Sequence, residues 1–175
     1  AVTDASGSVF LGWYAGATTA TGNMNIAIGY DAMNGAATTG DNNIAIGTSA
    51  GDALTSGHNN IAIGLDAGGA LADGLYNVLI GRNAGFEMTS ALNNVCIGSF
   101  AGTSLTTEDN VIAIGYGALY SLTSTSADNG GNIAIGRNSM TSANASGYLR
   151  NTAIGHYTMA NVGSNSATDN TVLGN

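Results

Sequence analysis

The chain contains no proline and no lysine, and charged residues make up only 8% of its 175 residues. Three arginines against eleven acidic residues leave a formal net charge of −8. Nucleic-acid binding requires clustered cations that replace phosphate counterions, so this composition excludes a nucleic-acid partner. An anionic membrane surface would repel the chain for the same reason, and the sequence has no apolar run of about 18 residues to predict membrane insertion.

The sequence also contains few candidate catalytic residues. Its single cysteine, Cys96, excludes an internal disulfide, and its apolar surroundings predict a packed small side chain and not a nucleophile. The two histidines, His58 and His156, lie far apart in sequence and are expected at the surface. The acidic residues fall mostly in turns, without the Gly-Gly-x-Gly-x-Asp repeat of calcium-binding β-rolls. We therefore expect no enzyme activity, no metal site and no cofactor.

Glycine is abundant, with 27 residues, and it ends the phrase of an internal repeat. Three mostly apolar residues followed by glycine recur along the chain, usually after asparagine, as in Asn60-Ile61-Ala62-Ile63-Gly64. Successive phrases are 17 to 21 residues apart, and they end at Gly12, Gly29, Gly47, Gly64, Gly81, Gly98, Gly115, Gly136, Gly155 and Gly174. A period that covers the whole chain predicts one stacked structural unit, in a single repeat domain over residues 1–175.

Each phrase predicts a short strand, because β-branched residues alternate and turn residues bound them. A unit of 17 residues is too short for two helices, and its glycines oppose helix formation. We therefore predict an all-β fold, a parallel β-solenoid (β-roll or β-helix) of about nine to ten rungs of 17–21 residues. A further apolar column seven residues after the glycine, including Leu54 and Leu71, predicts a second strand or extended segment that closes each coil.

Two columns are predicted to hold the stack together. The third strand position is predicted to be the core column, with Ile28, Ile46, Ile63, Ile80, Ile97, Ile114, Ile135 and Ile154. The asparagine before the strand is predicted to form a ladder of stacked amides, with Asn25, Asn43, Asn60, Asn77, Asn94, Asn132, Asn151 and Asn170. Val111 interrupts this column, so we expect a break or bulge there. The middle strand position is small and apolar, which invites a second layer or another chain.

The run Asn59-Asn60-Ile61-Ala62-Ile63-Gly64 and the run Asn151-Thr152-Ala153-Ile154-Gly155 resemble repeats of bacteriophage tail-fibre and related surface proteins. They are also similar to the head repeats of trimeric autotransporter adhesins, although the period here is longer. The resemblance covers nearly the whole chain. It implies parallel homotrimers packed around a threefold axis and a location outside the cell, at the cell surface or on a virion. The period is compatible with a left- or a right-handed coil, and the resemblance favours the left-handed one.

The expected function is a structural shaft segment of an extracellular or virion appendage, which binds itself as a homotrimer and presents a receptor-binding element. One alternative is an adhesin head that binds a glycan, a cell-surface receptor or a matrix protein. Another is a subunit that stacks end to end into a filament. An ice-binding face is disfavoured, because the threonines form no regular column. The start at Ala1 suggests a fragment or a processed chain, and no binding residues are assigned.

Overall fold

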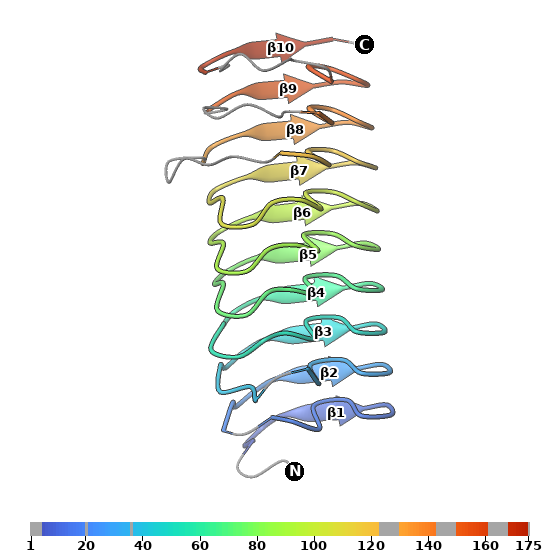
Figure 1. The fold of residues 1–175 in the computed structure, drawn as a ribbon, viewed down its shortest axis with the longest axis vertical. Coiled ribbons are helices and arrows are strands. Elements are labelled where there is room, and N and C mark those ends of the chain that lie inside the picture. Colours follow the sequence, from blue (N-terminus) through green and yellow to red (C-terminus); the bar gives the residue numbers. More distant parts are fainter. Residues whose placement is uncertain are drawn as a thin grey trace.

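The computed structural model describes residues 5–19, 21–35, 37–122, 130–142, 150–160 and 168–174. Over these ranges the chain is all-β, without helix, and ten short strands form one parallel sheet in chain order. Figure 1 shows the strands stacked from the N-terminal to the C-terminal end of a rod. They are β1 (Val9–Leu11), β2 (Ile26–Ile28), β3 (Ile44–Ile46), β4 (Ile61–Ile63), β5 (Val78–Ile80), β6 (Val95–Ile97), β7 (Ile112–Ile114), β8 (Ile133–Ile135), β9 (Thr152–Ile154) and β10 (Thr171–Leu173). The predicted parallel β-solenoid is confirmed.

The strands pair without any shift in register. Ile61 pairs with Val78 and Ala62 with Leu79, and the same column-by-column pairing holds at every step of the sheet. It also holds between β7 and β8, across the longest repeat. The inserted residues therefore leave the stack undisturbed, although the loop expected over 124–130 lies, apart from its last residue, outside the described part of the chain.

The chain turns sharply at each repeat glycine. At Gly64 φ is 132°, and Asp66 and Gly68 follow with φ of 53° and 58°. A Cβ built on Gly64 would lie 2.6 Å from the carbonyl oxygen of Gly81 in the next rung, so the stack leaves no room for a side chain there. Alternating left-handed residues make a compact turn. Leu54 and Leu71 lie in no strand, so of the two predicted forms of the closing segment, a second strand or an extended segment, the second strand is wrong. Outside the named strands, an isolated bridge joins Leu75 and Leu92.

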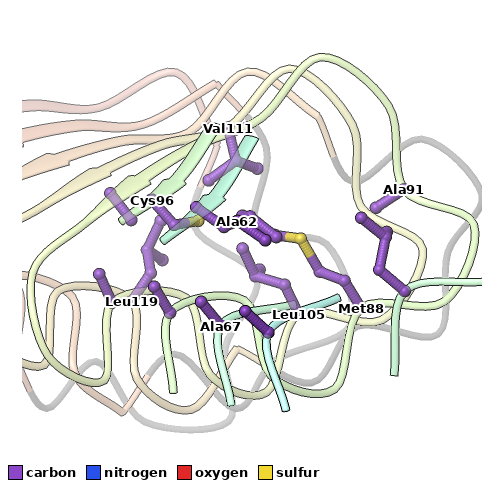
Figure 2. Packing of buried hydrophobic residues seen from close by; sticks show 14 of the residues in the cluster. Ala62, Ala67, Met88, Ala91, Cys96, Leu105, Val111 and Leu119 are labelled. Atoms are coloured by element: carbon purple, nitrogen blue, oxygen red, sulfur yellow. The ribbon is translucent and has the colours of Figure 1, made fainter. Parts of the chain in front are cut away.

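The core lies between the strands and the segments that follow the turns. Figure 2 shows the side chains of Ala62 (β4) and Cys96 (β6) inside the coil, together with those of Ala67 and Leu119. All four side chains are fully buried. Inside the coil, large strand residues face positions that lack a side chain. Leu79 fits because Gly68 and Gly85 lack side chains, and a Cβ on either would lie 2.8 Å or 2.7 Å from its methyl groups.

The side chains of the predicted core column point outward, away from the core. From β2 to β8 the middle strand residue is buried, whereas the first and third residues are only partly buried. The physical reason is space: Leu71, Met88 and Leu105 enter the coil from the return segments and leave room only for small residues on the strand. The assignment to the core was wrong for the outward-facing residues Ile28, Ile46, Ile63, Ile80, Ile97, Ile114, Ile135 and Ile154.

Candidate interaction surfaces

A column of asparagines before the strands links neighbouring rungs through its side chains. In Asn60, Nδ2 donates to Oδ1 of Asn43 (3.1 Å) and to the carbonyl oxygen of Gly74 (2.7 Å). The Oδ1 of Asn60 accepts from the backbone N–H and from Nδ2 of Asn77, both at 3.0 Å. The amide thus joins three successive rungs and is fully buried. The backbone N–H donates to the preceding amide oxygen at Asn43, Asn60, Asn77, Asn94, Asn151 and Asn170.

The ladder of amides stops where the sequence places valine. The backbone N–H of Val111 still donates to Oδ1 of Asn94 at 2.8 Å, but the valine side chain has no amide to offer to the next rung. The strands keep their register across this position, so the break occurs without a bulge.

A second asparagine often precedes the ladder and has a different role. Asn59 is exposed and has a φ of 60°, and Asn42, Asn93 and Asn110 occupy the same position with φ of 58–59°. Asparagine tolerates this left-handed conformation better than most residues. The doubled asparagine therefore combines a turn residue with a ladder residue. Sequence reasoning missed the first of these roles, although the tolerance of asparagine for positive φ was the available signal.

The outward face of the sheet is an apolar strip two side chains wide, which we call the isoleucine strip. It consists of the first and third residues of the strands, and neither column contains a charged residue. These side chains stay partly exposed from β2 to β8, and on the end rung Val9 and Leu11 are 52% and 64% exposed. The first column reads Val9, Ile26, Ile44, Ile61, Val78, Val95, Ile112, Ile133, Thr152 and Thr171.

Aromatic rings and guanidinium groups gather on the turns between β5 and β8. The Phe100 ring lies edge-on to Tyr116 and to Tyr120, with centroids 5.9 Å and 6.1 Å away. The guanidinium carbon of Arg82 lies 5.3 Å from the centre of the Phe100 ring, and that of Arg137 lies 5.8 Å from the Tyr116 ring. We call these five residues the aromatic–arginine surface. The sequence places Tyr116 directly after a repeat glycine, but sequence reasoning did not bring these side chains together.

Cys96 and the histidines have no catalytic surroundings. Burial raises the pKa of the Cys96 thiol to about 12, which keeps it protonated and unreactive at neutral pH. His58 and His156 are exposed, and the His156 ring lies 4.5 Å from that of Tyr157. Among the described residues, no group of three or more His, Cys, Asp or Glu side chains could hold a metal ion.

The acidic residues in the described part of the chain lie in turns and loops outside the strands. Burial raises the pKa of Asp52, and the nearby charges of Asp31 and Asp66 act in the same direction, against the backbone hydrogen bonds that lower it. Arg150 binds both carboxylate oxygens of Asp169, at 2.7 Å and 3.0 Å. This hydrogen bonding holds the pKa of Asp169 below its usual value, and the pair is exposed.

Comparison with known proteins assigns no family to this architecture. No protein-family model, curated protein or solved structure matches the chain. The described ranges contain no helix long and apolar enough to cross a bilayer.

Proposed function

We propose that the chain is a structural shaft segment of an extracellular or virion fibre, in which three parallel copies pack through the isoleucine strip. The observation that carries the proposal is the outward position of the isoleucine and valine columns. A single coil leaves these side chains partly exposed along the length of the sheet. A continuous exposed apolar patch of this kind is typical of a surface that another protein covers.

The strip is narrow, and the choice of three copies comes from the resemblance to tail-fibre and adhesin repeats. Nine rung spacings of about 4.8 Å and a strand width of about 10 Å give roughly 430 Å² per copy. Two copies would bury about 860 Å² in total, and three copies meeting at one axis would bury about 1,300 Å² spread over three contacts, so the strip alone is smaller than a standard two-partner interface in either assembly. Neither column contains a charged residue, so packing along the strip buries no charged side chain. The resemblance to tail-fibre and adhesin repeats implies the same symmetry.

The rung-to-rung bonding suits a mechanical role. Backbone hydrogen bonds join neighbouring rungs both in the strands and in the turns, as between the Gly68 N–H and the Ala84 carbonyl at 2.9 Å. The buried amide ladder adds bonds in the same direction. Bending or stretching the rod would strain many of these bonds together. We propose that this stiffness serves to hold a receptor-binding element away from a cell or particle.

Substitution in the strip tests the proposal. We expect Ile63→Asp combined with Ile80→Asp to convert a complex of three chains into single chains, because each copy would carry two charges into the shared interface. Light scattering at two protein concentrations measures the mass, and circular dichroism checks that the coil is retained. Ser90→Asp, which adds a charge on an exposed loop, is the matched control. The proposal fails if the native chain is monomeric at both concentrations, or if the double variant keeps the native mass.

A further inference from the structure

The fold does not require the aromatic–arginine surface. Phe100 has a φ of 61°, a conformation that is unfavourable for a bulky residue. The same turn position is polar in five rungs, with Asp31, Ser49, Asp66, Asn83 and Asn138, and it is glycine at Gly117 and aromatic only at Phe100 and, near the two ends of the rod, at Tyr14 and Tyr157. Burial does not account for the rings either, because Tyr116 and Tyr120 are 52% and 42% exposed. An unfavourable backbone conformation that supports an exposed ring cluster is a reason to look for a function.

The positive charge of the chain is concentrated at the same place. Arg82 and Arg137 are two of its three arginines, and neither forms an ion pair with a described residue. The third, Arg150, is paired with Asp169. Nearer the N-terminus, the corresponding turns carry Asp31 and Asp66. The turn edge, which follows the arrowheads of the strands in Figure 1, thus carries acidic residues after β2 and β4 and arginine after β5 and β8, with Glu87 in the same turn as Arg82.

This combination points to a sugar that carries a carboxylate. Exposed aromatic rings offer flat faces to the C–H groups of a sugar ring, and a guanidinium binds a carboxylate through two parallel hydrogen bonds. Gly117 lies within the cluster, and a Cβ there would lie 2.5 Å from Oδ1 of Asn138. Because Gly117 has no side chain, the Asn138 amide stays available to form hydrogen bonds with sugar hydroxyl groups. A polyanion is disfavoured, because the net charge of −8 would repel it.

We propose that the aromatic–arginine surface binds an oligosaccharide with an isolated carboxylate group. The rings stack on the sugar, and Arg82 or Arg137 binds the carboxylate. The two arginines lie three rungs apart, which is about 14 Å along the rod and leaves room for several sugar units between them. The inference does not depend on the shaft role, because this surface lies on the turns and the isoleucine strip lies on the strands.

The test is a titration of the whole chain, followed by the amide signals in its NMR spectrum. The probes are a trisaccharide ending in glucuronic acid and one ending in N-acetylneuraminic acid, each beside its carboxyl-reduced form. We expect at least one acidic probe to shift signals at residues 82–138 and to bind about tenfold or more tightly than its reduced form, because a charge-assisted pair is lost. Arg82→Gln with Arg137→Gln should abolish that preference, and Tyr116→Ala should weaken both forms.

The control is Tyr14→Ala, which removes a ring from an exposed pair with Trp13 where no guanidinium stacks. It should leave binding unchanged. The inference is overturned if no acidic probe binds at millimolar concentration, if acidic and reduced forms bind equally, or if an acidic peptide competes better than the sugar. It is also overturned if the variants change the assembled mass, since the surface would then be a contact between chains. A monomeric native chain that binds the acidic probe would contradict the shaft proposal alone.

Discussion

The inward and outward positions of the same strands carry opposite residue sizes. Inside, the middle position is alanine in most rungs and is fully buried. Outside, the two neighbouring positions are isoleucine or valine and are partly exposed. A sheet with one wet face normally places its large apolar residues in the core and polar residues on the other side. The reversal teaches that the strands turn small residues toward an interior filled by Leu71 and Met88, and leave their large residues available for contact with another chain.

Substitutions at the inward and outward positions of the strands should therefore have different effects. A larger side chain at an inward position has no space to occupy, because Leu71, Met88 and their neighbours already fill the interior of the coil. A change at an outward position alters only what lies outside the coil. Inward changes should unfold the chain, and outward changes should separate chains that remain folded.

The largest effect is expected from Ala62→Asp. Ala62 is fully buried in β4, and an unpaired carboxylate there should lower the free energy of unfolding by about 3–5 kcal/mol. Urea unfolding followed by circular dichroism measures the loss. The neighbouring change Ile63→Asp introduces the same charge on the outward side and should keep the coil spectrum. Equal unfolding midpoints for the two variants would remove the distinction between inside and outside.

A smaller effect is expected from Asn60→Ala. The change removes the hydrogen bonds of the Asn60 amide with Asn43, Gly74 and Asn77, and leaves buried groups without partners. The expected loss is about 2–4 kcal/mol. Asn59→Gly is the matched control, because Asn59 is exposed with positive φ and glycine adopts that conformation readily. Thermal unfolding should show a clear loss for the first variant and almost none for the second; similar losses would show that the ladder adds little.

The smallest effect concerns Cys96. A pKa of about 12 should slow maleimide labelling of the folded chain by about a thousandfold relative to an unfolded thiol with a pKa near 8.5. Because the folded pKa is raised, the associated stability is complete below the unfolded pKa and is lost as the pH rises toward 12. Labelling rates with and without urea provide the measurement. Rapid labelling of the folded chain would contradict the inward position of the middle column.

The sequence allowed the strands, their spacing and their parallel order to be predicted, because a repeat with one constant phrase admits few other folds. The direction of the strand faces could not be predicted from alternation alone, since both Ile63 and Ala62 are apolar. The missed signal was size complementarity: Leu79 replaces alanine in a rung flanked by Gly68 and Gly85. The aromatic–arginine surface was missed because Phe100 and Tyr120 meet only through the turn geometry.

The most direct test of the proposed three-chain shaft is small-angle X-ray scattering of the purified chain over a range of concentrations, which gives mass and length together. Side-by-side packing through the isoleucine strip predicts a constant mass near three times 17.3 kDa. The length should stay close to that of one rod, about 43 Å. A single-chain mass at every concentration would contradict the account. A length that grows in step with the mass would also contradict it, and would indicate end-to-end stacking of the coils.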